Sequence, residues 1–402
     1  MTDGFDTLRN IPPNTYFSVR VNMLSMPNNP SGTFLTRVSE FVNKLELSVF
    51  RDATFLIPPG VFLSSIQVLT ALPMKQLIIG VGDNNVTELL FYTCGLEQVS
   101  PTIGNLPLLE ELTLSGCAVR NFSLGTFARN RRLRILDLSF NQIESIVPPT
   151  RDISLAIEYL YLNSNQLEKL DMSAFASLAS LSMIDLRSNN LARVVADRTI
   201  TWSGMEMLDV SYNRLRTIDL QWLVAPNLKR LILSKNLFER IPDRLRRFPN
   251  LQLLVMSENN FTGGIDLAPL NGLPELNSVD FSNNPTARFL RSSRPLRLPV
   301  LDSLYVEYCS LSRFNTSSID LPVVSFVSLS HNKFSTVPPL AQAFPSIVSF
   351  SLINNPLPCS ALRLRSELIL SGKLILGPPQ TASACPDGSI QINSQYLFCC
   401  KA

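Results

Sequence analysis

Few residues of this chain have the type and spacing that catalysis requires. Its one histidine, His331, directly precedes Asn332, and no nucleophile is predictably held beside it. The pair Gly372 and Lys373 lacks the upstream glycine of a phosphate-binding loop, and no kinase or hydrolase signature occurs. We therefore expect a solvated histidine at a loop edge, no cofactor and no enzymatic activity.

Cysteines offer a second kind of chemistry. Four of the seven crowd into the C-terminal segment, at Cys359, Cys385, Cys399 and Cys400. A zinc site is the competing interpretation, but this segment has no histidine and no Cys-x-x-Cys pair, so disulfides in an oxidising compartment are favoured. A bond between the adjacent Cys399 and Cys400 would be strained. Each pairs more easily with Cys359 or Cys385, or one remains free to link two chains.

The residues between 86 and 358 repeat one pattern, apolar-x-x-apolar-x-apolar-x-x-(Asn or Cys)-x-apolar-x-x-apolar. We call the Asn or Cys of each repeat its keystone. The keystones are 23 to 25 residues apart, a period typical of short leucine-rich repeats. They are Cys94, Cys117, Asn141, Asn165, Asn189, Asn213, Asn236, Asn259, Asn284, Cys309, Asn332 and Asn355.

The pattern has a physical reason. Each repeat contributes one short strand, and successive strands stack in parallel with the fourth and sixth residues of the repeat inward and the third and fifth outward. The keystone amide bonds to the turn backbone of its neighbours, and a single repeat cannot bury its apolar side alone. The sequence therefore predicts an α/β solenoid, a leucine-rich repeat horseshoe with a parallel concave sheet and a cysteine-containing C-terminal cap.

Three segments are expected along the chain. Residues 1–85 form irregular N-terminal repeats and a cap, with strand-like pieces at Phe17 to Met23, Leu45 to Val49 and Leu77 to Ile79. Residues 86–358 form the regular repeats. Residues 359–402 form a disulfide-stapled C-terminal cap, in which Ser360 to Leu370 are expected to be an amphipathic helix closing the core.

Other features are assigned structural roles. Cys94, Cys117 and Cys309 replace asparagine at keystones, where a thiol serves as a small buried group. Phe127 and Phe175 belong to the core of the return path. The net charge of +3 is too small to indicate nucleic acid, and no apolar run reaches the length of a membrane span.

Evidence for the compartment is indirect. The first residues show no basic segment followed by an apolar stretch, so either a signal has been removed or the protein is intracellular. Four N-glycosylation motifs begin at asparagines that are neither keystones nor apolar positions of the repeat, and each is expected to be exposed. They are Asn85, Asn121, Asn260 and Asn315.

The outward strand positions form the candidate binding surface. An adjacent stripe of Ile, Tyr and Met flanked by aspartates favours contact with a protein partner, whereas an open curved sheet offers no deep pocket for a small ligand. The alternative role of the aspartates is solubility within the common Leu-Asp-Leu-Ser pattern. The predicted partner-binding residues are Ile135, Asp137, Tyr159, Tyr161, Met183, Asp185, Arg187, Met207, Asp209, Arg230, Ile232, Leu253 and Val255.

The sequence resembles secreted insect leucine-rich repeat proteins, in particular the mosquito leucine-rich immune proteins. The resemblance lies in the segment from Leu136 to Ile146, the phenylalanine-bearing repeats and the terminal pair Cys399 and Cys400. It implies a secreted module of innate immunity that binds a thioester-containing complement-like protein, and a disulfide-linked dimer through Cys399 or Cys400. The chain differs from that family in showing no signal peptide and no heptads of a coiled coil.

Two other classes of protein share these repeats. The ectodomain of a Toll-like or adhesion receptor would have the same repeats and cap. An intracellular scaffold would have the repeats but would keep its C-terminal thiols reduced, so that counting free thiols separates it from the extracellular classes.

Overall fold

The computed structural model describes residues 18–26, 31–148, 153–378, 380, 385, 387–392 and 396–401. The chain consists of two compact units, Met1–Met205 and Glu206–Ala402, which we call unit 1 and unit 2 and describe separately.

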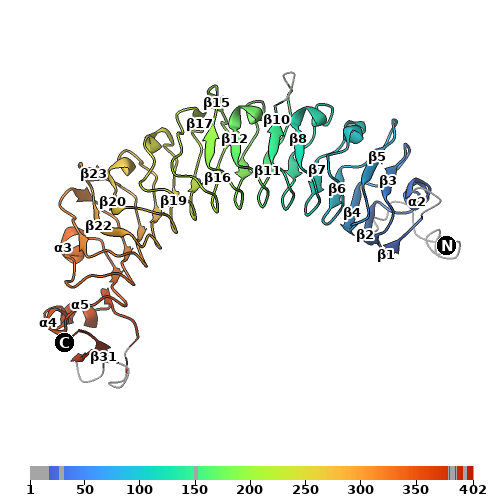
Figure 1. Ribbon diagram of the computed structural model, residues 1–402. Coiled ribbons are helices and arrows are strands. Elements are labelled where there is room, and N and C mark those ends of the chain that lie inside the picture. The colour runs from blue at the N-terminus through green and yellow to red at the C-terminus, as the bar shows by residue number, and fades with distance from the viewer. Residues whose placement is uncertain are drawn as a thin grey trace. The chain divides into compact units, whose positions relative to one another are not determined.

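Unit 1 is built around eight parallel strands, one from each coil of the chain, which lie side by side in Figure 1. In order across the sheet they are β1 (Ser18–Leu24), β2 (Lys44–Phe50), β4 (Ser65–Thr70), β6 (Glu88–Phe91), β7 (Glu111–Leu114), β9 (Ile135–Asp137), β11 (Tyr159–Tyr161) and β13 (Met183–Asp185). The return segments carry the helix α2 (Ser31–Val38), the 3₁₀ turns η1 (Pro101–Asn105), η2 (Leu124–Phe127) and η3 (Met172–Phe175), the short strand β15 (Ile200–Thr201), and three strand pairs. These pairs are β3 (Thr54–Ile57) with β5 (Gln76–Ile79), β8 (Asn121–Ser123) with β10 (Ser145–Val147), and β12 (Lys169–Asp171) with β14 (Arg193–Val195).

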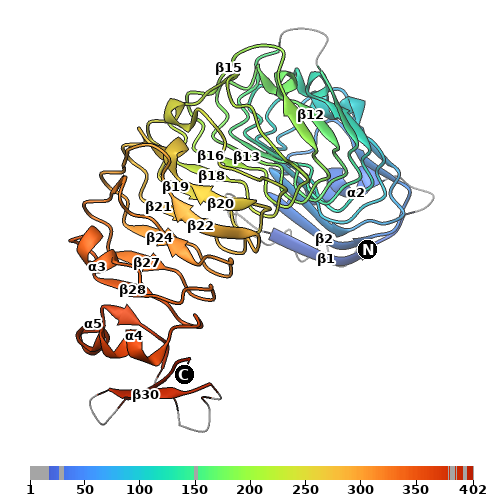
Figure 2. The same cartoon turned by 60° about the vertical axis from the view of Figure 1, so that its left-hand side comes forward.

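Unit 2 repeats the arrangement, as Figure 2 shows. Its eight sheet strands are β16 (Met207–Asp209), β18 (Arg230–Ile232), β19 (Leu253–Val255), β21 (Ser278–Asp280), β24 (Ser303–Tyr305), β27 (Phe326–Ser328), β28 (Ser349–Ser351) and β29 (Leu374–Ile375). The return segments carry β17 (Leu223–Val224), η4 (Leu245–Arg247), η5 (Ala268–Leu270), α3 (Leu340–Ala343), the strands β20 (Gly263–Asp266), β22 (Ala287–Arg291) and β25 (Arg313–Phe314), and the pair β23 (Leu296–Arg297) and β26 (Ile319–Asp320).

The core follows the predicted alternation of side chains. Leu136, Leu160 and Ile184 are the central residues of β9, β11 and β13, and each is fully buried. Phe127 and Phe175, the last residues of η2 and η3 on the return path, are also fully buried. The expected solenoid with a parallel sheet is therefore confirmed, and it is stable only because each coil covers its neighbours.

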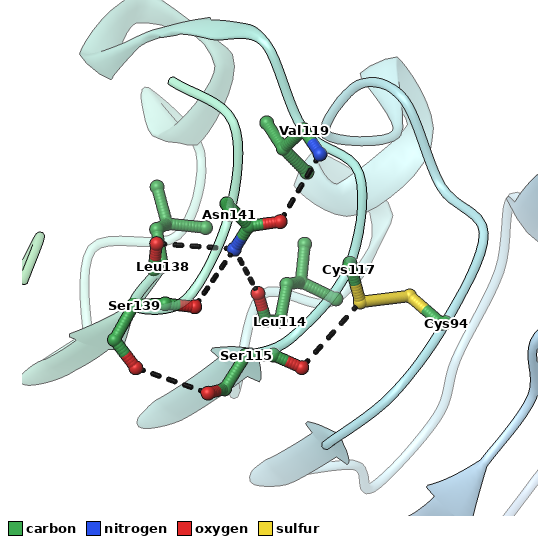
Figure 3. The surroundings of a disulfide bond; sticks show 8 residues. All are labelled: Cys94, Leu114, Ser115, Cys117, Val119, Leu138, Ser139 and Asn141. Atoms are coloured by element: carbon green, nitrogen blue, oxygen red, sulfur yellow. Dashed lines mark hydrogen bonds between the residues drawn. A yellow bond between two sulfur atoms is a disulfide. The ribbon is translucent and has the colours of Figure 1, made fainter. Parts of the chain in front are cut away.

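The keystone asparagines tie adjacent coils together. Asn165 donates from Nδ2 to the carbonyls of Leu138 and Leu162 at 2.9 and 3.0 Å, and its Oδ1 accepts the N–H of Ile143 at 2.9 Å. Figure 3 shows the same arrangement at Asn141, whose Oδ1 accepts the N–H of Val119 at 3.0 Å. From Phe140 to Asn354, every residue directly before a keystone has a positive φ between 49° and 59°. The keystone bonds thus hold a tight turn that side chains otherwise disfavour.

The structure corrects the prediction for two keystone cysteines. Cys94 and Cys117 form a disulfide rather than two buried thiols, as Figure 3 shows. Equivalent positions of adjacent coils stack, so their Cα atoms are only 4.4 Å apart, within the range that a disulfide spans. Cys309, whose neighbouring keystones are asparagines, remains a buried free thiol as expected.

The N-terminal coils belong to the same sheet as the regular repeats. Two predicted strand pieces correspond to β1 and β2, although Phe17 lies outside the described residues. The third, Leu77 to Ile79, lies in β5 on the return path and not in the main sheet. The sheet strand of that coil is Ser65–Thr70, which the sequence pattern did not single out.

The C-terminal segment contains the predicted disulfides. The expected helix consists of two short ones, α4 (Cys359–Arg363) and α5 (Ser366–Leu370), followed by an antiparallel pair, β30 (Ser389–Ile392) and β31 (Tyr396–Cys399). Cys359 bonds to Cys400 and Cys385 bonds to Cys399. Both cysteines of the terminal pair are thus used within the chain, which is contrary to the expectation that Cys399 or Cys400 links two chains.

Candidate protein-binding surface

The outward residues of the unit 1 sheet form two rows. The first row contains the third residue of each repeat, and the second row contains the fifth. Tyr159 of the first row is in register with Ile135 on one side and Met183 on the other. All three side chains are half-buried. The predicted stripe of Ile, Tyr and Met is therefore continuous across three neighbouring strands.

The second row of unit 1 alternates between acidic and aromatic residues. Tyr161 is in register with Asp137 and Asp185. Arg187, at the end of this row, is exposed and its Nε is 3.0 Å from Oδ2 of Asp185.

Unit 2 carries the remaining predicted residues on its own two rows. The first row places Met207, Arg230 and Leu253 in register, and the second places Asp209, Ile232 and Val255 in register. Arg230 is exposed, whereas Met207, Leu253, Ile232 and Val255 are half-buried. This face is more aliphatic than that of unit 1.

The aspartates of the second row have a structural role, whereas the sequence interpretation gave solubility as the alternative to contact with a partner. Asp185 and Asp209 are 2% and 4% exposed, so the prediction that they face a partner is wrong. Oδ1 of Asp185 accepts the N–H of Arg187 at 3.1 Å, and Oδ1 of Asp209 accepts that of Ser211 at 2.8 Å. Asp137 makes the same bond to Ser139 but stays half-buried. These carboxylates fix the turn that follows each strand.

Sequence reasoning missed the acidic part of the unit 1 face. Glu88 and Glu111 continue the first row beyond Ile135, and Leu90 and Thr113 continue the second row beyond Asp137. The same repeat pattern, counted two coils further toward the N-terminus, identifies all four positions. In unit 2 the missed feature is an aromatic pair, Tyr305 and Phe326, whose ring centroids are 5.7 Å apart.

These carboxylates create a negative potential on the unit 1 face. Burial, followed by the charges of Glu88 and Asp137, raises the pKa of Glu111. Burial also raises the pKa of Tyr92, and the charge of Glu111 raises it further. Burial likewise raises the pKa of Tyr161, and there the charge of Asp137 adds to the effect. At the edge of the face, Arg134 forms a two-pronged ion pair with Glu158, with both N–O distances 2.8 Å.

The histidine lies in unit 2, on a turn edge. His331 is half-buried and its ring stacks on that of Tyr308 with centroids 3.9 Å apart, while Nδ2 of Asn354 lies 3.3 Å from a ring nitrogen. Within the described residues, no group of three or more His, Cys, Asp and Glu side chains is arranged to hold a metal ion.

The glycosylation motifs differ in exposure. Asn85, Asn121 and Asn315 are exposed, while Asn260 is half-buried. Across the described ranges, no helix has the length and apolar character needed to cross a bilayer.

Comparison with known proteins identifies the repeats directly. The family model described as Leucine rich repeat matches residues 155–191 and 203–261, and a second one, Leucine Rich Repeat, matches residues 132–150. The chain is 28% identical over 174 residues to the volume-regulated anion channel subunit LRRC8D of Rattus norvegicus, which covers 43% of this chain and 17% of that protein. It is also 28% identical over 148 residues to the leucine-rich repeat-containing G-protein coupled receptor 4 of Xenopus tropicalis, covering 35% of this chain and 15% of that protein. The chain therefore spans less than a fifth of either relative.

Solved structures resemble the chain over nearly its whole length. The LRIM1/APL1C complex matches with a TM-score of 0.65 at 17% identity, covering 96% of this chain and 69% of that chain. The APL1 leucine-rich repeat domain matches with a TM-score of 0.62 at 17% identity, covering 96% and 97%. The LRR protein LIC12759 of Leptospira interrogans matches with a TM-score of 0.54 at 17% identity, covering 93% and 98%. At such identities the likeness concerns the fold.

None of these matches indicates an enzyme family. The repeat pattern, the parallel strands with their keystone bonds and the matching family models together show that this chain contains leucine-rich repeats and folds as a leucine-rich repeat solenoid.

Proposed function

We propose that this chain is a secreted, non-enzymatic protein-binding module of innate immunity that docks its partner on the outward faces of its sheets. The observation that carries the proposal is the register of the first row of unit 1, where Tyr159 lies between Ile135 and Met183. Tyrosine and methionine are enriched where proteins bind one another, and a row of half-buried apolar side chains gains most when a partner covers it.

The partner is a protein rather than a small molecule. The rows lie on the surface of a sheet, whereas a small ligand is bound in a concave pocket that covers most of its surface. A similar fold occurs in the LRIM1/APL1C structure, which is itself a complex of two chains. A complement-like thioester protein is the partner that the resemblance to mosquito immune proteins implies.

Secretion is supported by the cysteines. Three disulfides, Cys94–Cys117, Cys359–Cys400 and Cys385–Cys399, persist in an oxidising compartment and are rare in the cytosol. The exposed motifs at Asn85, Asn121 and Asn315 are open to glycosylation on the same route.

Affinity capture from the native fluid tests the proposal. The wild-type chain is compared with the triple variant Tyr159→Asp, Met183→Asp and Met207→Asp, which places charges on the first row of each unit. We expect the wild type to recover a specific protein and the variant to lose it, because a charge buried against an apolar partner without a counter-charge costs several kcal/mol.

A matched control carries the same kind of change away from the sheets. Val81→Asp and Leu364→Asp alter side chains that are 83% and 80% exposed and lie outside the sheet strands. This variant should recover the partner as the wild type does. Equal recovery by the wild type and the triple variant, with both folded by circular dichroism, would rule out the sheet faces as the docking site.

A further inference from the structure

We propose that a groove beside β8, on the return path of unit 1, holds the first sugars of a glycan attached to Asn121. This inference rests on the proposed function, because N-linked glycans are added to proteins that are secreted. It gives a binding role to a part of the surface that lies outside the strands of the main sheet. It follows from the position of the acceptor asparagine, the size of the groove and the side chains that line it.

Strand β8 fixes the position of Asn121 on the surface. Phe122 is 4% exposed, whereas Asn121 is exposed and in register with Ser145 of β10. Successive residues of a strand point to opposite faces, so the burial of Phe122 turns Asn121 and Ser123 of the acceptor motif outward. A bridge to Gln98 holds Asn121 from its other side. The acceptor side chain therefore leaves the chain at a defined place.

A groove of about 650 Å³ lies at this place. Such a volume is within the range of about 300–1,000 Å³ that small-ligand sites have. Three successive coils contribute to its wall, and Asn121 is itself a lining residue. A sugar linked to the amide of Asn121 therefore starts at the wall of the groove. Around Asn121 the groove is lined by Gln98, Gly104, Gly125, Thr126, Arg129 and Val147.

Small residues keep the groove open. Gly104, Gly125 and Ala128 line it and carry at most a methyl group. A Cβ atom added to Gly125 would have only Oγ of Ser123 within 4 Å, at 3.3 Å, so a larger side chain at this position would extend into free space. That space is available to a ligand of the size of a sugar.

The side chains of the groove suit the chemistry of a sugar. Those of Gln98, Thr126 and Arg129 make no hydrogen bond or ion pair within the described part of the chain, and all three line the groove. They offer donors and acceptors to the hydroxyl and acetamide groups of N-acetylglucosamine. Val147 is 47% exposed and offers an apolar surface to the C–H groups of a sugar ring.

An attached glycan is favoured over a free oligosaccharide. Gln98 and Arg129 are exposed, and a free sugar that binds such side chains must also give up its translational freedom. A covalent link at Asn121 removes this cost, because a short tether supplies an effective concentration of the order of millimolar. Contacts too weak to hold a free sugar are thus sufficient for the attached one.

Protection from an endoglycosidase tests the inference. The full chain is secreted from cultured animal cells, behind an added signal peptide, with a mannosidase inhibitor that leaves every glycan in the oligomannose form. The folded protein is treated with endoglycosidase H, which cuts between the first two sugars, and mass spectrometry follows Asn121, Asn85 and Asn315. We expect cleavage at Asn121 to be roughly tenfold slower than at the other two exposed sites, and equally fast at all three after denaturation.

Two variants change the groove and keep the acceptor motif. Gly125→Leu fills the groove, and Thr126→Ala with Arg129→Ala removes polar partners of the sugar. Both should bring cleavage at Asn121 to the rate at Asn85. The control is Gly204→Leu, the same substitution at an exposed glycine that does not line the groove. It should leave Asn121 protected, and circular dichroism verifies that each variant is folded.

The results separate this inference from the proposed function. A wild-type chain without a glycan at Asn121, or with equal cleavage rates at all three sites, overturns the inference. Protection that both groove variants retain overturns it too. If Asn121 of the secreted chain is protected while the protein isolated from its natural source carries no glycan at any motif, the groove binds the glycan as inferred and the proposal of a secreted protein has failed.

Discussion

Replacing the keystone Asn165 with alanine tests the physical basis of the fold. Asn165 is 7% exposed and makes one hydrogen bond as acceptor and three as donor, all to backbone. In the variant the N–H of Ile143 loses its only side-chain acceptor. The carbonyls of Leu138 and Leu162 each lose one donor. The carbonyl of Leu138 keeps the keystone amide of the preceding coil as a donor, and that of Leu162 keeps the keystone amide of the following coil.

The expected loss of stability follows from these partners. A buried N–H without an acceptor costs about 1–3 kcal/mol, and weakening two carbonyl bonds adds roughly 0.5 kcal/mol each. We therefore expect Asn165→Ala to lower the free energy of unfolding by about 2–4 kcal/mol.

Urea denaturation followed by circular dichroism measures this difference. Gln166→Ala is the control, because Gln166 is exposed and its substitution should change stability by no more than about 0.5 kcal/mol. An Asn165→Ala chain that unfolds within about 1 kcal/mol of the wild type, or no earlier than the control, would refute the role assigned to the keystone.

Four further measurements probe particular residues. Because the pKa of Glu111 is raised in the folded chain, the stability of the wild type falls as the pH rises through that pKa. Glu111→Gln should therefore raise the melting temperature at neutral pH and leave it unchanged below pH ~4. A melting temperature that the substitution lowers at neutral pH contradicts the electrostatics of the face. Burial raises the pKa of the Cys309 thiol to about 11, so iodoacetamide should modify it only in denaturant, with one free thiol counted per chain; rapid native labelling contradicts its burial. Replacing both Cys94 and Cys117 with serine should lower stability by about 3 kcal/mol in denaturation, since their bond closes a loop of 23 residues, and no loss would mean that the bond is absent. Asp209→Ala should cost about 1–2 kcal/mol by the same method because the N–H two residues on loses its acceptor, whereas an unchanged midpoint would contradict the turn role.

The period of the repeat was sufficient to predict the parallel sheet and the side of each strand residue. Asn165 could be predicted as a buried keystone because a small amide can accept a hydrogen bond from a backbone N–H of the turns and donate one to a backbone carbonyl. Ser65–Thr70 was missed because its coil has Ala71 at the keystone position, bridged to Cys94, and so lacks the polar marker of the repeat.

The strand positions of the candidate residues could be predicted from the sequence, but their burial could not. Tyr159 and Met183 lie in register because the outward positions of successive repeats must align. The burial of Asp185 could not be read from the pattern, since it depends on how neighbouring turns close around the carboxylate. The bond between Cys94 and Cys117 was within reach, because adjacent keystones stack and two cysteines at such positions are brought together.

Photo-cross-linking from the sheet face tests the proposed docking site most directly. A photoreactive phenylalanine analogue is introduced at Tyr159 in one chain and at Val81, away from the sheet face, in another, and each is irradiated in the native fluid. The account predicts a discrete cross-linked product from position 159 and none from position 81. A product from position 81 alone, or the same products from both positions, would contradict it.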